Sequence, residues 1–513
     1  MTLYTRRTFS AMLAARAQHA PEAVALHERD TSYTYGDLWQ SVQKFALNLR
    51  AQGLGPGDRV AVLNNKTIDT VVALFGAAAA RMVFVPVNPV LKSDQVRHIL
   101  SDSGAQILVT SSARLSQLDL SDVEIRVTCI DNDDAGDIPW RSFNEQALVP
   151  LDDAQEDDVV SILYTSGSTG KPKGVVLSQA NMTVGAASVA EYLNNSPEDV
   201  ILSLLPLSFD AGLSQLTTAF HSGASVVLLD YLLPQDVVKA VTKYAVTGIT
   251  GVPPLWHQIA GCKWEEVGHQ LRYFANTGGK MPRNLLESLR TVFPKASPFL
   301  MYGLTEAFRS TYLDPQQVDA RPDSIGKAIP NAVVSVIGKD GKPCAPGEPG
   351  ELVHSGPLVA LGYWNNKEKT AERFKPSPLA APELPNPPFA VWSGDQVMQD
   401  EEGYLYFVGR EDEMIKSSGY RISPTEVEEA LMAISSVNEA VVFGVEDEGI
   451  GQRIVAVLSG DAAQEKELKK ELVSALPNFM VPHEFNWLDD LPKNPNGKID
   501  RSRLRSELQE RIA

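Results

Sequence analysis

Cysteine is scarce in this chain of 513 residues: Cys129, Cys262 and Cys344 lie far apart and form no Cys-x-x-Cys pair. Their odd number and wide spacing argue against a disulfide framework or a zinc cluster, and predict a reducing compartment, the cytoplasm. The sequence also lacks a long run of Lys and Arg, and its formal net charge is −18. Because such a surface repels phosphate backbones, a nucleic-acid partner is disfavoured.

Long hydrophobic runs are absent as well. The longest, Val71–Val87, is broken by Arg81, which predicts a buried helix over Val71–Ala80 and a strand over Val83–Val87 rather than a membrane span. Near the N-terminus, Arg6-Arg7 resembles a twin-arginine export signal, but charged residues interrupt the segment that follows. A signal requires an uninterrupted apolar segment there, so we predict an amphipathic helix instead.

The length and the alternation of patterns predict the architecture. A chain of this size exceeds one compact core, so we expect at least two domains. Strand-like runs such as 59–63, 106–110 and 224–229 alternate with helical patterns, which is typical of an α/β fold with helix-covered sheets. After Gly409 the pattern becomes shorter and indicates a small α+β domain. We therefore predict a large N-terminal domain over 1–411 and a small, mobile C-terminal domain over 412–513, with the proline-rich segment 376–388 as a surface loop.

A loop rich in Gly, Ser, Thr and Lys is the strongest motif. It lies between predicted strands over 159–164 and 175–177. Small residues expose backbone N–H groups, hydroxyls add donors and lysines add positive charge, so this composition predicts a cradle for a polyphosphate. It is not a Walker A loop, because the glycine spacing is wrong and Pro172 stands where the Mg²⁺-binding hydroxyl would be, which disfavours a P-loop NTPase. The loop comprises Thr165, Ser166, Gly167, Ser168, Thr169, Gly170, Lys171, Pro172, Lys173 and Gly174.

This loop resembles the signature of the AMP-forming adenylating superfamily, which includes acyl-CoA synthetases, adenylation domains of nonribosomal peptide synthetases and luciferases. Five further stretches resemble the superfamily's motifs in the expected order. Within the superfamily, residues 302–312 and 413–420 resemble free-standing ligases found beside bacterial exosortase systems. The five stretches are Tyr302-Gly303-Leu304-Thr305-Glu306, Ser324-Ile325-Gly326-Lys327 with Gly350-Glu351-Leu352, Ser393-Gly394-Asp395, Gly409-Arg410-Glu411-Asp412, and Pro495-Asn496-Gly497-Lys498-Ile499-Asp500-Arg501.

The resemblance implies an enzyme that uses ATP and Mg²⁺ to activate a carboxylic acid. Attack of one anion on another at the α-phosphorus makes charge neutralisation the main requirement. The resemblance assigns catalytic roles to Glu306, which would hold Mg²⁺, to Thr305, which would touch the α-phosphate, and to Lys498, which would bridge the carboxylate and the α-phosphate. It also implies a nucleotide site made of Thr165, Ser166, Gly167, Ser168, Thr169, Gly170, Lys171, Lys173, Gly278, Gly279, Lys280, Tyr302, Gly303, Asp395 and Arg410.

The resemblance further implies a second half-reaction. The C-terminal domain would rotate about Asp412, and the loop containing Gly419 would line a channel for a pantetheine thiol. The sequence shows no Asp/Gly-Ser carrier motif in a four-helix context. We therefore expect the thiol to be supplied in trans, by CoA or by a separate acyl or peptidyl carrier protein with phosphopantetheine.

The acid itself is less constrained by the sequence. The stretch 207–212 resembles the pocket motif of amino-acid adenylation domains, so Asp210 would face a substrate ammonium, because a buried carboxylate needs a cationic partner. Alternatively, Asp210 caps a helix over Ala211–Ala219. Arg309 would favour a second acidic group on the substrate or form a salt bridge with a nearby acid. The pocket predicted from the resemblance comprises Asp210, Ala211, Ser214, Gly251, Asn276, Met301, Arg309 and Ser310.

The leading functional prediction is an AMP-forming acid–thiol ligase for a carboxylic acid that is small and amine-bearing. Two alternatives keep the fold: a fatty or aryl acyl-CoA synthetase without amino-acid specificity, and an enzyme that stops at the acyl-adenylate or diverts it to an amide. A catalytically silent scaffold is a third, and the joint presence of Glu306, Asp395, Arg410 and Lys498 disfavours it.

Overall fold

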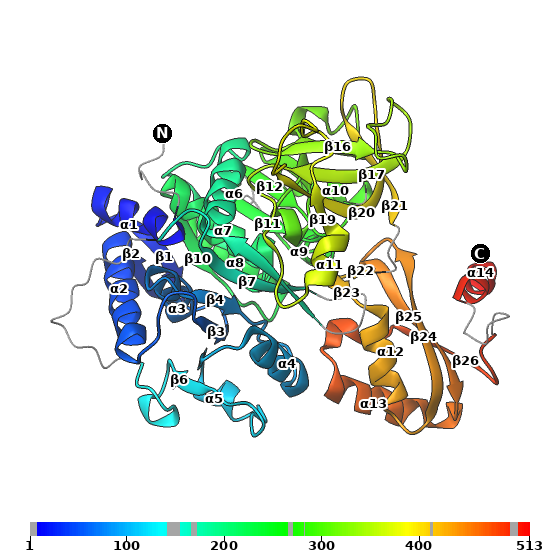
Figure 1. Cartoon of the computed structure of the whole chain (residues 1–513), viewed down its shortest axis with the longest axis horizontal. Helices are drawn as coiled ribbons and strands as arrows, with labels where there is room; N and C mark the ends of the chain where they lie inside the picture. The colour runs from blue at the N-terminus through cyan, green and yellow to red at the C-terminus, as the bar shows by residue number, and fades with distance from the viewer. Residues whose placement is uncertain are drawn as a thin grey trace.

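The structure, a computed structural model of the chain, describes residues 8–140, 154–165, 172–264, 270–281, 283–410, 414–492 and 501–512. Helices and strands alternate, as the sequence predicts, and the strands form three sheets. Two sheets and their helices make up a large N-terminal part, and the third sheet belongs to a smaller part that follows β21 (Leu405–Arg410) (Figure 1). Among the described residues, no helix has the length and apolar character needed to cross a membrane.

The first sheet has a parallel centre with antiparallel extensions on both sides. Its parallel strands bring their carboxyl ends to one edge, which is where α/β sheets bind ligands. The described strands run in the order β16 (Val333–Ile337), β17 (Gly350–Ser355), β20 (Phe389–Gln399), β21, β15 (Ser324–Ala328), β14 (Thr311–Leu313), β13 (Ser297–Tyr302), β12 (Tyr273–Asn276), β11 (Gly248–Gly251), β9 (Val200–Ser203), β10 (Ser225–Leu228), β1 (Val24–Glu28) and β2 (Thr31–Thr34), with β19 (Phe374–Pro376) beside β20.

The second sheet carries the strands on either side of the predicted phosphate loop. Strands β7 and β8 pair antiparallel, with Thr165 opposite Lys173, so the loop 166–171 joins two neighbouring strands. Residues 166–171 themselves lie outside the described part of the chain. The order is β18 (Gly362–Tyr363), β8 (Lys173–Ser178), β7 (Val159–Thr165), β4 (Val83–Pro86), β3 (Arg59–Leu63), β5 (Ile107–Thr110) and β6 (Arg126–Cys129).

Helices packed on these sheets bury most of the apolar side chains. The predicted helix over 71–80 is α3, and it is buried on all sides because it lies between other helices and strands, which explains its nearly continuous apolar sequence. Phe75 of α3 stacks on Phe9 of α1 at 4.3 Å and meets Phe220 of α7 at 5.2 Å between ring centroids. The N-terminal helices are α1 (Phe9–His19), α2 (Tyr35–Ala51), α3 (Ile68–Ala79), α4 (Ser93–Ser103), α5 (Ser112–Leu115), α6 (Gln179–Tyr192), α7 (Asp210–Ser222), α8 (Pro234–Tyr244), α9 (Pro253–Ala260), α10 (Arg283–Val292) and α11 (Lys367–Arg373).

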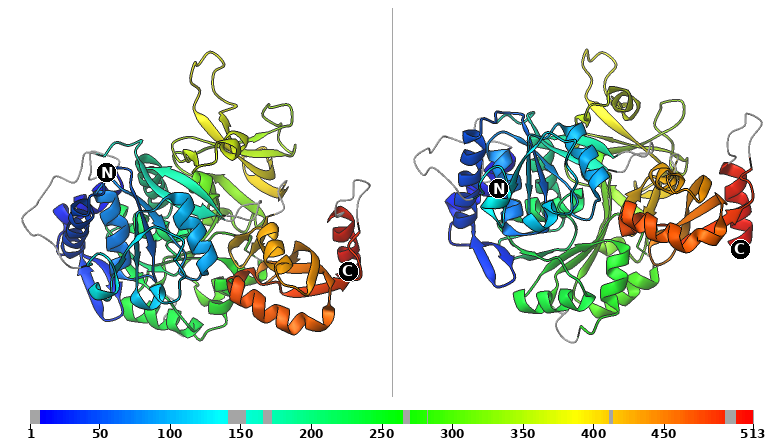
Figure 2. Two further views of the ribbon diagram at one scale, coloured as in Figure 1. Left: turned by 60° about the horizontal axis from the view of Figure 1, so that its bottom comes forward. Right: turned by 90° about the horizontal axis from the view of Figure 1, so that it is seen from below.

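The C-terminal part has a core of its own. Helices α12 (Pro424–Met432) and α13 (Glu465–Ala475) pack on one face of its sheet, and α14 (Arg501–Ile512) contributes to a second cluster with strands of that sheet. Its described strands are β23 (Tyr420–Ile422), β22 (Ile415–Ser417), β25 (Gly451–Gly460), β24 (Val437–Asp447) and β26 (Glu484–Leu488). Figure 2 shows this part, in orange and red, beside the large part.

The proline-rich segment forms an exposed loop between β19 and β20, as the sequence predicts. Its ends are held together because the backbone N–H of Ser377 donates to the carbonyl of Pro388 at 2.8 Å. The predicted domain boundary at 411/412 and the hinge residue Asp412 fall within 411–413, outside the described residues.

Candidate active site

A large cleft of about 1410 Å³ lies between the two parts of the molecule. Its walls come from the segments that follow β9, β11, β12 and β13 at their carboxyl ends, and from the β22–β23 hairpin of the C-terminal part. The two-residue turn of this hairpin has positive φ at both positions, Ser418 (+54°) and Gly419 (+79°), as hairpins of this kind require. Parts of the chain far apart in sequence therefore meet in one cavity.

One side of the cleft has the features expected for an adenosine site. Tyr302 ends β13, and its hydroxyl donates to the carboxylate of Asp395 on β20. Asp395 is buried, and its backbone N–H donates to the Ser393 hydroxyl at 3.0 Å. Register pairs Asp395 with Arg410 of β21. The structure thus brings together three residues from separate predicted motifs. Gly278, Gly279, Lys280, Gly303 and Thr305 also line the cleft.

Glu306 lies in a positively charged environment. Its carboxylate is buried, Oε1 accepts a hydrogen bond from the Tyr363 hydroxyl at 2.7 Å, and Oε2 is 4.0 Å from the Arg421 guanidinium. Lys173 lies over the Tyr363 ring at 4.6 Å. Burial opposes ionisation of Glu306, but Arg421, the Tyr363 hydroxyl and Lys173 together hold its pKa below the usual value. Glu306 is therefore anionic although it is 4% exposed.

Glu306 is also suited to hold Mg²⁺. Oε2 accepts no hydrogen bond from the described residues, and a buried carboxylate oxygen is the ligand type that Mg²⁺ prefers. Within the described part of the chain, no three His, Cys, Asp or Glu side chains form a metal-binding group. A single protein carboxylate is enough for Mg²⁺ that is bound mainly through nucleotide phosphates and water.

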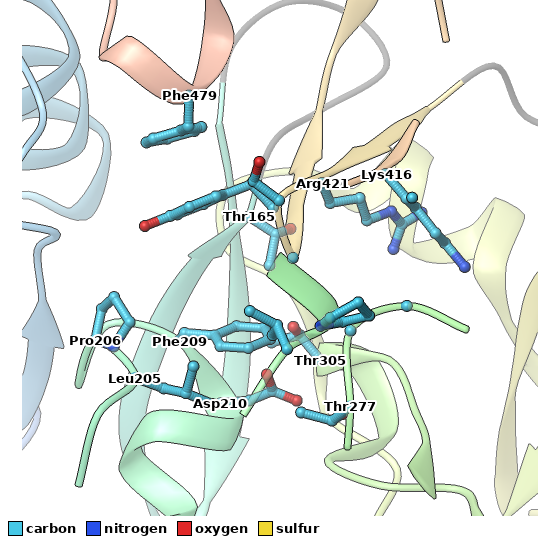
Figure 3. Close-up of a pocket in the computed structure, with 18 of the residues that line it drawn as sticks. Thr165, Leu205, Pro206, Phe209, Asp210, Thr277, Thr305, Lys416, Arg421 and Phe479 are labelled. Carbon is cyan, nitrogen blue, oxygen red and sulfur yellow. The ribbon is translucent and has the colours of Figure 1, made fainter. Parts of the chain in front are cut away.

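Asp210 and Arg309 form a buried ion pair at the floor of the cleft. Arg309 Nη1 is 3.7 Å from Asp210 Oδ2, and the two side chains are 3% and 4% exposed. The same nitrogen donates to the Thr277 hydroxyl at 3.3 Å. Figure 3 shows the Asp210 carboxylate directed toward Thr277, across the cleft from Arg421 and Lys416. Of the two possibilities for Arg309, the structure contains the salt bridge to a nearby acid.

The helix-cap alternative for Asp210 is wrong in its original form. Helix α7 begins at Asp210 itself, and Phe209 occupies the N-cap position without a side-chain hydrogen bond. Asp210 is instead the first residue of the helix, where the helix dipole favours an acid. Burial raises the pKa of Asp210, and the attraction of Arg309 only partly offsets this effect.

The other predicted pocket residues divide into two groups. Asn276 lines the cleft, and Ala211 and Ser214 line a cavity of about 10 Å³ behind Arg309, while Met301 lines both. Two predictions are corrected. Gly251 packs against α9, since a Cβ at that position would meet Trp256 and Leu255, and the buried Ser310 hydroxyl contacts Nδ1 of His354 at 2.9 Å. Neither lines the cleft or the small cavity.

The hairpin turn lies against the floor of the cleft. A Cβ at Gly419 would be 2.6 Å from Val252 Cγ1, and a Cβ at Gly278 would be 3.4 Å from the Gly419 carbonyl oxygen. Two further contacts join the parts: Gln95 Nε2 donates to Glu426 Oε1 at 2.8 Å, and His257 Nε2 lies 3.1 Å from the Glu448 carbonyl oxygen. Gly419 therefore lines the cleft where the two parts meet.

Several predicted residues cannot be located. Lys498 and Asp412 lie outside the described residues, as do Ser166, Gly167, Ser168, Thr169, Gly170 and Lys171. Conversely, sequence reasoning did not identify Tyr363, the hydrogen-bond donor to Glu306. The two residues are 57 positions apart, and no local pattern marks a tyrosine as a partner for a distant acid.

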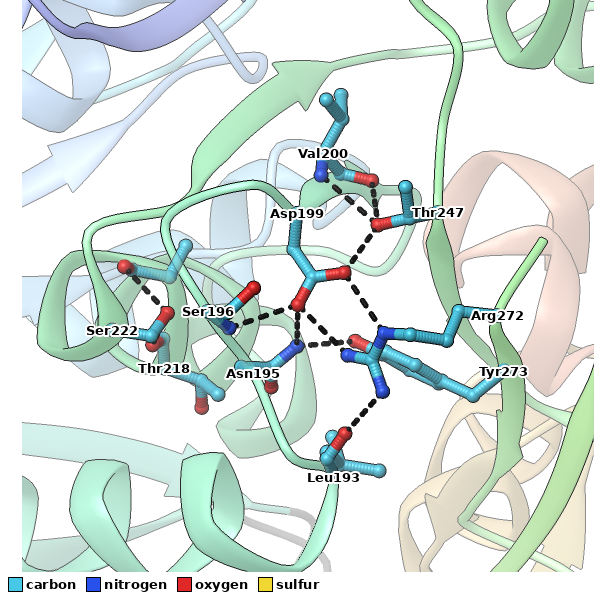
Figure 4. Close-up of polar contacts among 11 residues, drawn as sticks. Leu193, Asn195, Ser196, Asp199, Val200, Thr218, Ser222, Thr247, Arg272 and Tyr273 are labelled. Carbon is cyan, nitrogen blue, oxygen red and sulfur yellow. Dashed lines mark hydrogen bonds and ion pairs between the residues drawn. The ribbon is translucent and has the colours of Figure 1, made fainter. Parts of the chain in front are cut away.

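The amino ends of the central strands are fixed by a separate polar cluster, shown in Figure 4. Asp199, just before β9, accepts from Thr247 at 2.6 Å and from Arg272 at 2.8 and 3.0 Å; these two residues precede β11 and β12. The backbone N–H of Ser196 adds a bond at 2.9 Å. Burial opposes ionisation, but the three donors hold the pKa of Asp199 below its usual value. Because this cluster aligns the amino ends of β9, β11 and β12, it also fixes the positions of their carboxyl ends, which lead into the walls of the cleft.

Comparisons with known proteins agree with this geometry. The sequence profile described as "AMP-binding enzyme" matches residues 13–364, and that of "AMP-binding enzyme C-terminal domain" matches residues 426–498. L-proline–[L-prolyl-carrier protein] ligase of Pseudomonas fluorescens is 31% identical over 97% of this chain and 98% of that protein. Surfactin synthase subunit 2 of Bacillus subtilis is 30% identical over 98% of this chain, which spans only 14% of that protein's length.

Among solved structures, a double mutant of o-succinylbenzoate CoA synthetase from Bacillus subtilis, bound with its product analogue OSB-NCoA, superposes with a TM-score of 0.84. It is 28% identical and covers 96% of this chain and 98% of its own. The profile match covers more than half of the chain, and the cleft holds the corresponding motif residues. The chain belongs to the AMP-binding enzyme family.

Proposed function

We propose that this chain is an AMP-forming acid–thiol ligase. In the first step, a carboxylate oxygen attacks the α-phosphorus of ATP, the bond to the β-phosphate oxygen breaks, and pyrophosphate leaves. In the second, a pantetheine sulfur attacks the acyl carbon of the adenylate, the bond to the phosphate oxygen breaks, and AMP leaves. The observation that supports the proposal most strongly is that one cleft gathers Tyr302, Asp395 and Arg421 with the Gly419 turn. Glu306 lies directly behind this wall, 4.0 Å from the Arg421 guanidinium.

The nucleotide would lie along the carboxyl ends of the parallel strands. We assign Asp395 to the ribose hydroxyls, because its buried carboxylate is an acceptor. Its neighbour Tyr302 would stack on the adenine ring. Glu306 would hold Mg²⁺, which, when bound, supplies positive charge that screens the phosphates. Thr305 and Lys173 would donate to phosphate oxygens, together with the loop 166–171, Arg410 and Lys498.

We propose that the arrangement of the two parts is the one suited to thiol transfer. The B. subtilis CoA synthetase superposes with a TM-score of 0.84 when bound with its CoA product analogue, but with 0.70 when it holds its acyl-adenylate or AMP. In this chain the Gly419 turn lies against Val252 and Gly278 on the floor of the cleft, and Arg421 of the same hairpin lies beside Glu306. We propose that residues 412–513 rotate on 1–411 about Asp412, and that Arg421 takes over the neutralisation of Glu306 once Mg²⁺ and pyrophosphate have left.

The acceptor would be CoA or the phosphopantetheine of a separate carrier protein, since relatives named as a CoA synthetase and a carrier-protein ligase both match along nearly the whole chain. Four of the matching peptide synthases are far longer than this chain, which spans 6–14% of their length. We propose that the enzyme works in the cytosol, a compartment in which the three unpaired cysteines stay reduced.

The two half-reactions give a direct test. ATP–pyrophosphate exchange over a panel of acids measures adenylation, and thioester formation with CoA or a phosphopantetheinylated carrier measures transfer. Lys498→Ala should abolish exchange while sparing transfer from supplied acyl-adenylate. Absence of exchange with every acid would refute the ligase, and equal loss of both activities in the variant would refute the rotation.

A further inference from the structure

The Asp210–Arg309 pair lies in the part of the cleft that receives the acid, if the proposed function is correct. Among the described residues, Glu306 is the other ionisable side chain whose charge acts on Asp210, and Glu306 has its own cations, Arg421 and Lys173. The walls of the cavity behind Arg309 contain no other charged side chain among the described residues. Among the described residues, the part of the acid subsite around Asp210 therefore has one carboxylate and one guanidinium, which neutralise each other.

This balance decides which substituent the subsite accepts. An ammonium would add an uncompensated positive charge beside Arg309, because Asp210 is already paired. Protonation of Asp210 would leave Arg309 unbalanced and repel an ammonium still more. A second carboxylate would add an uncompensated negative charge beside Asp210. Burial makes either excess charge costly, so the subsite favours an uncharged substituent.

The unused hydrogen-bonding atoms specify that substituent further. Asp210 Oδ1 and Asn276 Oδ1 are buried acceptors, and Arg309 Nε is a buried donor; none of the three has a hydrogen-bond partner among the described residues. A hydroxyl can donate to a carboxylate and accept from a guanidinium at once, whereas an ammonium only donates and a carboxylate only accepts. A methyl group would leave all three atoms unsatisfied, which is costly in a buried site.

The pocket also ends near the pair. The cavity behind Arg309, closed by Ser214, Gln215 and Thr218, has about 10 Å³, which is room for about one water molecule. A substituent that reaches Asp210 therefore stops there. From charge balance, orphaned atoms and this limit, we propose that Arg309 is a specificity-determining residue that converts the ammonium position of the subsite into one for a hydroxyl, and that the acid activated is a hydroxy acid rather than an amino acid.

Matched acids test the proposal. ATP–pyrophosphate exchange is measured with L-alanine, L-lactate and propionate, which differ only in an ammonium, a hydroxyl or a hydrogen. The comparison is repeated with β-alanine, 3-hydroxypropionate and malonate for the next carbon, and with phenylalanine, phenyllactate and 3-phenylpropionate for a larger acid. In at least one series, the hydroxy acid should give a kcat/KM at least tenfold above that of every other member.

Variants separate specificity from a structural role. Arg309→Gln leaves Asp210 unpaired, and should raise the ratio of amino-acid to hydroxy-acid kcat/KM at least tenfold. The double variant Asp210→Asn/Arg309→Gln has no charge in the subsite, and should return the ratio to within about threefold of the original. A merely structural Arg309 would lower activity with all acids alike.

The outcomes are distinguishable. Exchange with no acid in any series would refute the ligase function, and the inference would fall with it. Exchange that favours an amino acid, a dicarboxylic acid or the unsubstituted acid in the original protein would overturn the inference and leave the ligase function standing. An unchanged ratio in Arg309→Gln, with the thermal midpoint within a few degrees of the original, would also overturn it.

Discussion

Substitution of Gly419 by alanine offers the sharpest test of the thiol-transfer arrangement. In this arrangement an added Cβ would lie 2.6–2.8 Å from three side-chain atoms of Val252, so the hairpin and α9 would have to move apart. Gly419 also has φ of +79°, a conformation that costs an L-residue about 1–2 kcal/mol in any arrangement that preserves the turn. Only the clash with Val252 is specific to the arrangement described here.

The expected loss of thioester formation in Gly419→Ala follows from the clash with Val252 alone. Overpacking a tight contact by one methyl group costs about 1–3 kcal/mol, which corresponds to a fall of about 5- to 160-fold in the equilibrium constant for forming this arrangement. Thioester formation from supplied acyl-adenylate should decrease by that factor in Gly419→Ala. ATP–pyrophosphate exchange, which uses the other arrangement, should change by less than about threefold.

A second substitution serves as the control. Val252→Gly removes all three atoms that the new Cβ would meet, and glycine is acceptable at the N-cap position that Val252 occupies before α9. Combined with Gly419→Ala, it should restore most of the lost transfer. Equal loss of exchange and transfer in the single variant, or no recovery in the double variant, would refute the assignment of this arrangement to thiol transfer.

Two further predictions concern buried acids. Asp199→Asn should lower the free energy of unfolding, measured by urea denaturation, by about 2–3 kcal/mol. This is somewhat less than the loss expected on breaking a fully buried ion pair, because Arg272 is 37% exposed. Since the pKa of Asp199 is lowered in the folded state, its contribution is present above about pH 4 and is lost as the pH falls through the folded value, so the difference between the two proteins should shrink in acid. An unchanged difference at pH 3 would contradict this. Burial raises the pKa of Glu426, at its contact with Gln95, to about 7, so the contact weakens as the pH rises from about 4.5 to 7. Glutamine does not ionise, so the thioester-transfer rate of Glu426→Gln, divided by that of the original protein, should rise over that range and stay level above it. A ratio that does not change with pH would contradict a role of this contact in transfer.

The sequence identified the elements whose patterns are local. The helix α3 and strand β4 were predicted from one apolar run, and the proline-rich loop from residues that suit neither a helix nor a central strand. Motif order also indicated the family, because each motif carries a chemistry that does not depend on knowing its neighbours. Residues 166–171 and Lys498, which lie outside the described part, remain predictions.

The sequence-based predictions were wrong or incomplete where they depended on which residue a side chain contacts in the folded chain. Gly251 and Ser310 were assigned to the pocket. In the structure Gly251 is packed against α9, and the Ser310 hydroxyl contacts His354 instead. Tyr363 escaped notice because its partner Glu306 is distant in sequence.

The sequence by itself determined that this chain has a helix-covered sheet, a phosphate-binding composition and the ordered motifs of an adenylating enzyme, since periodicity and residue chemistry are properties of short segments. Only the tertiary structure decided that Asp210 is paired with Arg309 and that Arg421 faces Glu306. Charge balance in a buried site depends on which groups lie within a few ångströms of each other, and long-range packing sets those distances.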